Sequence, residues 1–320
     1  MKHLPLYNPQ FENLYKEFSQ MVKTKSYAGA NHMATNIREF LFFIETRGVN
    51  TIREVKATDI FAYHEYLSER PNQRREGGLS DSSVRRHIYL LRIFFDNLLD
   101  TAQINATPAR LPKFGIVKYQ ERNIATIEEI KQIYSEAKTM LEKAILGLAY
   151  GCGLRRSEIA KLNTSDIDFH KGMLTVRCGK LGKTRAVPIS EKVLTDLKNY
   201  LFYERNIKLQ ETKIKINSAF LLSKRGYRIY AQDLNTIVKA LVKKTKNPEL
   251  QTKDITLHCL RHSIATHLLD NGASIEFVQK FLGHEMLDTT HIYSKRRKQK
   301  QIILEAVHRE QQQNKNIKEE

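Results

Sequence analysis

Two segments in the second half of the chain place arginine side chains where phosphate chemistry could use them. In GCGLRRSEIAKL, two glycines lead into a predicted helix that presents Arg155 and, three residues on, Glu158. In LHCLRHSIATHLL, His258 and Arg261 stand three residues apart and therefore share one face of a helix. Taken alone, the first pattern would indicate only a surface ion pair at a glycine-rich helix entry.

A third segment, GKLGKTR, lies between two β-rich runs and predicts the tip of a hairpin. Its Lys180 and Lys183 are expected to project from a short turn, either as solvated charges or as phosphate contacts. The segment resembles a P-loop, but that motif needs a glycine where Arg177 stands and a helix after it. We therefore reject the P-loop interpretation.

The fourth segment, FLGHEMLDTTHIY, places His284 nine residues before Tyr293. His258 and His262 have the spacing of zinc ligands, but no HExxH glutamate and no third ligand accompany them. Arginine forks match phosphate oxygens and stabilise a pentacoordinate transition state. A tyrosine nucleophile stores the bond energy in an ester, so resealing needs no ATP. The four segments together predict attack on a phosphodiester without a metal or another cofactor.

Positive charge is concentrated in the second part of the chain. The net charge is +18, of which residues 1–110 contribute +3 and residues 111–320 contribute +15. This surplus favours a polyanionic partner because each neutralised phosphate releases counterions, although a surplus for solubility is the alternative. Scattered cysteines, the lack of a signal sequence and the lack of a long apolar run predict a cytoplasmic protein without membrane contact.

Residues 1–102 are expected to form a helical domain, because apolar residues recur at helical spacing almost throughout. The strongest helix begins at Ser80 and Asp81. Arg85 and Arg86 lie off its apolar stripe, as DNA contacts or as part of a solvated face. The stripe consists of Val84, Ile88, Leu91, Phe95 and Leu98.

Residues 103–123 contain two prolines and a glycine without any period, and are expected to be a linker. Residues 124–310 are expected to form a mixed α/β domain, followed by a polar tail at 311–320, so that the whole chain is mostly α with a small hairpin or sheet. Helices are predicted at 126–150, 154–162, 190–203, 231–244, 259–270, 274–282 and 299–310. Strands are predicted at 173–178 and 184–189, with 218–223 as a further candidate.

In their order, the four segments resemble the signature boxes of the tyrosine recombinases, the family of phage integrases, Xer recombinases and Cre. The family's motifs fall on Gly153-Leu154-Arg155-Arg156-Ser157-Glu158, on Lys180, on His258-Cys259-Leu260-Arg261, on Leu282-Gly283-His284 and on Tyr293. The N-terminal helices resemble the SAM-like core-binding domain. The resemblance therefore covers nearly the whole chain.

The resemblance implies a role for each matched residue. Tyr293 would attack the scissile phosphate, forming a 3′-phosphotyrosine and freeing a 5′-hydroxyl, while Arg155 and Arg261 hold the non-bridging oxygens. A free tyrosine has a pKa of about 10, so the cationic pocket must favour its ionisation.

The remaining matched residues would support that attack. Lys180 would be the general acid toward the leaving 5′-oxygen, and His258 would assist proton transfer and phosphate binding. His284 would hydrogen-bond the phosphate, and Glu158 would orient its neighbours. Further candidates for DNA contacts are Arg85, Arg86, Lys183 and Arg185.

For the assembly, the resemblance implies two domains that clamp duplex DNA at specific sites on the nucleoid. Four protomers, or protomers together with a related recombinase, would exchange strands through a Holliday junction. The helix at 299–310 would dock onto a neighbouring protomer, and packing onto its own domain is the alternative. The compact length, without an arm-binding domain ahead of residue 9, favours a Xer-like recombinase. A type IB topoisomerase and a DNA-binding protein without catalysis are the alternatives. Dimer resolution, integration with excision, and inversion all stay open as the biological role.

Overall fold

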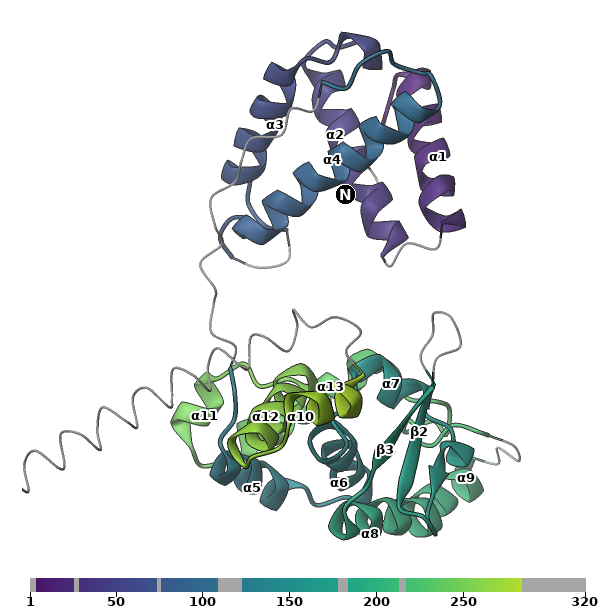
Figure 1. Ribbon diagram of the computed structural model, residues 1–320, viewed down its shortest axis with the longest axis vertical. Coiled ribbons are helices and arrows are strands. Elements are labelled where there is room, and N and C mark those ends of the chain that lie inside the picture. Colours follow the sequence, from purple (N-terminus) through teal and green to yellow (C-terminus); the bar gives the residue numbers. More distant parts are fainter. Residues whose placement is uncertain are drawn as a thin grey trace, which may run out of the picture. The chain divides into compact units, whose positions relative to one another are not determined.

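The computed structural model describes residues 4–25, 29–73, 76–108, 123–177, 184–212 and 217–283. The chain folds into two compact units, Met1–Gln120 and Glu121–Glu320 (Figure 1). Both are mainly helical, and the second also holds a small antiparallel sheet, so the predicted fold class is confirmed. Within these ranges, no helix combines the length and the apolar character that a bilayer-spanning segment needs.

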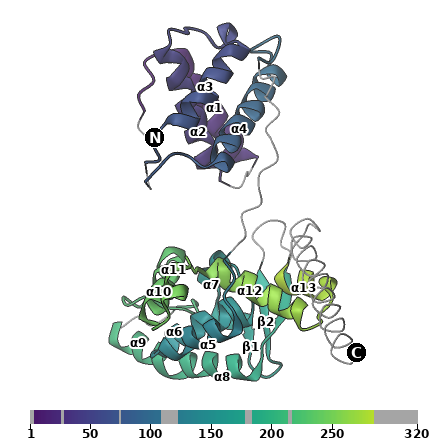
Figure 2. The same ribbon diagram turned by 90° about the vertical axis from the view of Figure 1, so that its left-hand side faces the viewer.

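In its described residues, the N-terminal unit is a bundle of four α-helices (Figure 2). Its helices are α1 (Pro9–Thr24), α2 (Ala30–Thr46), α3 (Ala57–Glu69) and α4 (Asp81–Asp100). Helix α2 contacts the other three. The aromatic rings of Phe18 and Phe94 meet edge to face with centroids 5.3 Å apart, which is a favoured geometry for packed aromatic side chains. The bundle core is therefore built largely from aromatic and branched side chains of α1, α2 and α4.

The apolar stripe predicted for α4 is confirmed. Each of its five members is at most 5% exposed, and the helix begins at Asp81 as expected. Arg86 and Arg92 are exposed, and Arg85 is half-buried. The helix therefore presents basic side chains away from the core that its apolar face forms.

In the described part of the C-terminal unit, nine α-helices pack together with a three-stranded sheet that lies at one side of them (Figures 1 and 2). The helices are α5 (Ile127–Glu136), α6 (Met140–Leu146), α7 (Arg156–Lys161), α8 (Glu191–Asn199), α9 (Arg205–Thr212), α10 (Ala231–Lys244), α11 (Pro248–Thr252), α12 (Leu257–Asp270) and α13 (Ile275–Leu282). The strands are β1 (Ile167–Asp168), β2 (Met173–Arg177) and β3 (Thr184–Pro188). Helix α6 and the π-helical turn that follows it at Gly147–Gly151 contact α8, and that turn also packs on α12.

The sheet is antiparallel throughout, in the order β1-β2-β3. In the hairpin, Leu174 pairs with Val187 and Val176 pairs with Arg185. Leu174, Val176 and Val187 are buried, so one face of the hairpin packs on the domain core. The predicted hairpin is confirmed, whereas β1 was not predicted.

The single helix predicted at 126–150 is wrong, because two helices occupy that range. Thr139 begins α6 with a capping box: its hydroxyl accepts from the Glu142 amide, and the Glu142 carboxylate accepts from the Thr139 amide. The same box, formed by Thr126 and Glu129, begins α5. The apolar period continues across the break, so periodicity alone does not reveal it.

Two other expectations also need correction. The helix predicted to end at residue 203 continues through a π-helical turn (Tyr200–Glu204) into α9. The candidate strand 218–223 forms isolated bridges instead, from Ala219 to Asn163 and from Leu222 to Arg228. The helix predicted at 299–310 lies outside the described residues.

Candidate active site

Four of the predicted catalytic and supporting residues lie in the described ranges. They are Arg155, Glu158, His258 and Arg261. Lys180, Lys183, His284 and Tyr293 lie outside the described residues. The described ones come from α7 and α12, and the structure joins three of them in one ionic cluster.

The approach to α7 positions Arg155. Gly153 has a φ of +60°, and a Cβ there would lie 2.8 Å from the ring of Phe281 and 2.9 Å from Leu282. Only glycine fits this left-handed position so close to α13. Arg155 then caps α7, and its backbone amide donates to Glu158 Oε2 at 2.8 Å. The GLR motif thus packs the chain onto α13 and begins the helix that carries Glu158.

Glu158 is the centre of the cluster. Its Oε1 accepts from Arg155 Nη1 at 2.9 Å and from Arg185 Nη1 at 2.9 Å, and its Oε2 accepts from Arg185 Nη2 at 2.8 Å. Arg261 Nη1 lies 3.7 Å from Oε2. Burial by itself would raise the pKa of Glu158, but the bonds from Arg185 and Arg155 outweigh it and lower the pKa to about 2. The carboxylate is therefore charged at neutral pH.

The same three arginines also bind the end of α13. Arg261 Nη2 donates to the carbonyl of Leu282 at 2.6 Å, Arg155 Nη2 donates to that of Gly283 at 3.2 Å, and Arg185 Nε donates to that of Phe281 at 3.2 Å. Carbonyls in the last turn of a helix have no partner within the helix, and the dipole there favours positive charge. The arginines therefore fix the chain at the residue before His284.

Charge in this cluster is not balanced. Among the described residues, three guanidinium groups surround one carboxylate, which gives these four side chains a net charge of +2. The Arg155 side chain is 41% exposed, whereas those of Arg185 and Arg261 are 9% and 3% exposed. The arrangement is suited to an anion that approaches from the side of Arg155, and a phosphodiester matches guanidinium geometry.

The model of the phage integrase family matches residues 124–300, which contain this whole cluster. The chain belongs to the phage integrase family. It is 34% identical over 282 residues to the tyrosine recombinase XerA of Pyrococcus horikoshii, covering 81% of this chain and 88% of that protein. It is 29% identical over 296 residues to XerC of Bacillus subtilis, covering 89% and 91%. The resemblance to Xer-like tyrosine recombinases is thereby confirmed.

Solved integrase-family structures share the fold. The XerH site-specific recombinase bound to its difH substrate superposes with a TM-score of 0.65 at 20% identity, covering 90% of this chain and 81% of that one. The Tn1549 transposon integrase in complex with transposon right end DNA gives 0.66 at 19%, covering 88% and 94%. At these identities, the likeness shows the common fold.

This integrase-family chain also pairs two histidines on α12. His262 Nε2 lies 2.8 Å from His258 Nε2, with His262 buried and His258 exposed. When both rings are neutral, one donates and the other accepts, so the tautomers of the two histidines are coupled. From the sequence, His262 was interpreted only as a possible zinc ligand. Its i, i+4 spacing from His258 was the available signal for this contact.

Arg185 was predicted as a candidate for DNA contact, but its side chain lies largely in the interior of the domain. Its side chain is 9% exposed, and its guanidinium forms a two-pronged pair with Glu158. The signal was present in the sequence, because alternation along β3 places residue 185 on the same face as the buried Val187. The contact of Arg185 with Glu158 was not predicted from the sequence.

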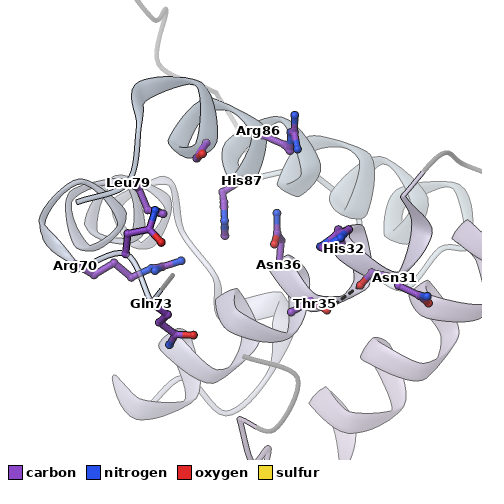
Figure 3. A pocket seen from close by; sticks show the side chains of 11 residues that line it. Asn31, His32, Thr35, Asn36, Arg70, Gln73, Leu79, Arg86 and His87 are labelled. Atoms are coloured by element: carbon purple, nitrogen blue, oxygen red, sulfur yellow. Dashed lines mark hydrogen bonds between the residues drawn. The ribbon is translucent and has the colours of Figure 1, made fainter. Parts of the chain in front are cut away.

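A cleft of about 690 Å³ lies within the N-terminal unit, between α2, α4 and the segment that follows α3 (Figure 3). Amide and basic side chains dominate its lining, among them Asn31, Asn36, Gln73, Arg70 and Arg86. Arg86, one of the predicted DNA-contact candidates, thus lies at a polar hollow rather than on an isolated stretch of surface. Arg85, its neighbour in sequence, is not among the lining residues.

Proposed function

We propose that this tyrosine recombinase cuts and rejoins DNA at specific sites through a covalent bond to Tyr293. The observation that carries the proposal is the cluster of three arginines around Glu158 at the end of α13, whose four described side chains have a net charge of +2. Tyr293 follows Gly283 by ten residues in the sequence. The relatives named tyrosine recombinases supply the reaction class.

In the proposed reaction, the Tyr293 hydroxyl attacks the scissile phosphorus while Arg155 and Arg261 hold the non-bridging oxygens. A bond forms from the tyrosine oxygen to phosphorus, and the bond to the 5′-oxygen breaks. Lys180 gives a proton to that leaving oxygen, and His258 accepts the phenolic proton. The pentacoordinate transition state carries more negative charge than the substrate, so a prearranged cationic cluster lowers its free energy most.

Glu158 and His284 complete the proposed site as supporting groups. Glu158 holds the guanidinium planes in place, as its bonds to Arg155 and Arg185 support. His284 directly follows Gly283, whose carbonyl accepts from Arg155. A hydrogen bond from His284 to the phosphate would therefore depend on the same anchored helix end.

We further propose that the N-terminal helical domain, over residues 1–102, reads the site sequence through the cleft shown in Figure 3. Asn and Gln side chains suit the edge of adenine, and arginine suits that of guanine. Asn36, Gln73 and Arg86 supply both kinds at one hollow. Arg85 and Lys183 would add contacts to the DNA backbone.

The assembly belongs to the same proposal. A linker at 103–123 joins the N-terminal domain to the catalytic domain over 124–310, so both can engage one duplex in the cytoplasm. The XerH recombinase is bound to a difH substrate in its solved structure, and a lambda integrase forms a dimer bound to a COC′ core site in another. By analogy, protomers of this chain would pair on each site, and two such pairs would exchange strands.

Covalent capture tests the function directly. The protein is incubated with nicked duplexes of randomised sequence in EDTA, and complexes that resist SDS are isolated and sequenced. A nick beside the cleavage point lets the short strand leave, so the covalent intermediate accumulates. We expect adducts that share a consensus sequence, and binding without any adduct would contradict catalysis.

A second assay separates recombination from topoisomerase activity. A supercoiled plasmid with two copies of the recovered consensus is compared with a plasmid that has none. We expect deletion or inversion between the two copies and no relaxation of the second plasmid. Relaxation of both plasmids at equal rates, without rearrangement, would contradict the proposed function.

A further inference from the structure

We propose that Arg185 is a positioning residue that neutralises Glu158, so that Arg155 and Arg261 direct their charge to the scissile phosphate. This inference rests on the proposed function of the cluster. It adds a residue of β3 to the machinery, at a position that the sequence offered only as a DNA contact.

Of the three arginines, Arg185 makes the most complete side-chain contact with the Glu158 carboxylate. Its two terminal nitrogens lie 2.8 and 2.9 Å from the two carboxylate oxygens, in the fork arrangement that arginine and carboxylate groups favour. Both side chains are 9% exposed, so solvent screens the pair little. Arg155 reaches one oxygen at 2.9 Å, and Arg261 stands 3.7 Å away. Among the described side chains, Arg185 is thus the one whose guanidinium binds both oxygens at once, while Arg155 binds Oε1 through its side chain and Oε2 through its backbone amide.

Removal of Arg185 would change which groups Glu158 attracts. Of the cations in the described ranges, its negative charge would then face Arg155 and Arg261, the two groups assigned to the phosphate. In a poorly solvated cluster, the carboxylate would compete with the phosphate for both of them. The excess positive charge would also fall from two to one. Arg185 therefore acts on the phosphate through Glu158, without contacting it.

A merely structural role for Arg185 makes a different prediction. The residue also anchors β3 to α13 through the bond from Nε to the Phe281 carbonyl. If only that packing mattered, replacing Glu158 as well would remove further hydrogen bonds and worsen the defect. If charge neutralisation matters, replacing Glu158 by glutamine removes the competitor and restores activity.

The test measures the rate of adduct formation on a nicked duplex that carries the recovered consensus. Arg185→Met should slow it by about 100-fold, the scale of a misplaced catalytic group. The double variant Arg185→Met/Glu158→Gln should recover to within about tenfold of the wild type, because no carboxylate remains to compete. Arg185→Lys, which keeps the charge but not the fork, should fall between the two. A double variant as slow as Arg185→Met would overturn the inference.

A neutral substrate gives a second, independent readout. With a methylphosphonate at the scissile position, the reacting group lacks its negative charge, so competition from Glu158 matters less. The deficit of Arg185→Met relative to the wild type should then shrink to below about tenfold. An equal deficit on both substrates would mean that Arg185 only supports the fold.

Arg228→Met is the matched control. Arg228 is another half-buried arginine of this domain, and it donates to the Ala160 and Leu162 carbonyls and to Asn163, not to Glu158. This variant should lose thermal stability but keep its adduct rate at a temperature where it is folded. An equal loss of adduct rate in Arg228→Met and Arg185→Met would contradict a specific role.

Binding of inorganic phosphate separates this inference from the proposed function. Phosphate that binds the folded cluster raises the melting temperature by mass action, whether or not DNA is cleaved. The rise should be smaller in Arg185→Met than in the wild type, and should return in the double variant. If the wild type forms no adduct but follows this pattern, the proposed function fails and the inference stands. Equal rises in all three proteins would overturn the inference.

Discussion

Each of the two units holds a carboxylate beside arginine in its interior, and the pKa values of the two carboxylates are shifted in opposite directions. In the N-terminal unit, Glu39 is 1% exposed and lies 2.7 Å from Arg70 Nε, with His87 also nearby. Burial outweighs the attraction of Arg70 and raises the pKa of Glu39. In the C-terminal unit, hydrogen bonds from Arg185 and Arg155 outweigh burial and lower the pKa of Glu158 to about 2.

The difference lies in the number of cations that surround each carboxylate. Among the described residues, one guanidinium pairs with Glu39, and this pair ties α2 to the residue that follows α3. Three guanidinium groups surround Glu158 and leave an excess that an anion can complete. A balanced buried pair indicates a structural link, whereas an unbalanced one indicates a binding site.

Removal of one arginine from each cluster should give the largest effects, and effects of different kinds. Arg261→Ala should slow adduct formation by about 10²–10³-fold, because a donor to the transition state is lost. Arg70→Ala should instead destabilise the N-terminal unit by about 3–5 kcal/mol, since it leaves Glu39 buried without its cation. Adduct kinetics and chemical denaturation measure the two losses. If the Arg261→Ala variant cleaved DNA at the wild-type rate, the cluster around Glu158 would not be the binding site that this comparison makes it.

Mild acid should weaken the N-terminal unit first. Burial, and then the charges of Arg70 and Arg86, lower the pKa of His87 to about 4. An unfolded histidine titrates near pH 6.5, so between about pH 6.5 and 4 only the unfolded state gains that proton. The unit should lose on the order of 3 kcal/mol over this range, while the raised pKa of Glu39 opposes part of the loss.

The stabilising effect of Glu158 has a different pH window. Because its folded pKa is about 2, its contribution is complete above about pH 4.5 and is lost only as the pH falls from there toward 2. Hydrogen exchange, compared between pH 7 and pH 5, should show that α4 opens more often at pH 5, whereas the opening of α7 should change little. His87→Gln should abolish the change in α4. Equal acceleration of both helices in the wild type would contradict this assignment.

Two glycines, one in each unit, allow the same comparison with a smaller expected effect. Gly283 (φ +64°) and Gly48 (φ +81°) are both left-handed, but a Cβ at Gly283 would lie 2.7 Å from Arg185 Cδ, whereas one at Gly48 meets nothing within 4 Å. Alanine at either position should cost about 1–2 kcal/mol of backbone strain. Only Gly283→Ala should also slow adduct formation, by about tenfold, because it displaces Arg185. An equally slow Gly48→Ala variant would point to a general folding defect.

The smallest expected effect concerns the cap that divides the predicted helix at 126–150. Thr139→Ala removes the acceptor for the Glu142 amide and should destabilise the C-terminal unit by about 1 kcal/mol. Thr236→Ala, in the middle of α10, is the matched control and should change stability little. Denaturant midpoints of the two variants measure the difference. Identical midpoints would show that the cap is not needed to begin α6.

Local patterns predicted much of the fold. Helix α10 spans residues 231–244 as predicted, and the hairpin lies within one residue of its predicted bounds. In both cases an unbroken period is bounded by polar or turn residues, so the local signal is complete. The division at Thr139 was missed although the T-x-x-E signal was present, because the apolar period on either side is continuous.

The candidate site was predictable only in part. The residue types in the GLR and HxLR motifs indicated phosphate chemistry, and the structure brings Arg155 and Arg261 together around Glu158. Their bonds to the carbonyls at the end of α13 were not predictable, since Arg155 and Gly283 are 128 positions apart and a backbone carbonyl leaves no mark in the sequence. The pairing of Arg185 with Glu158 was not predictable either, because it depends on how β3 packs against α13 in the tertiary structure.

The central claim is that DNA becomes attached to Tyr293, and the most direct measurement is the mass of the peptide that carries the nucleotide. Adducts captured on the nicked duplex are digested with nuclease and protease, and the modified residue is located by fragmentation. Tyr230→Phe serves as the matched control, because Tyr230 is a 76% exposed tyrosine of the same domain. We predict a nucleotide phosphate on Tyr293, an unchanged yield in Tyr230→Phe, and no adduct in Tyr293→Phe. A nucleotide on any other residue, or an adduct that persists in Tyr293→Phe, would contradict the account.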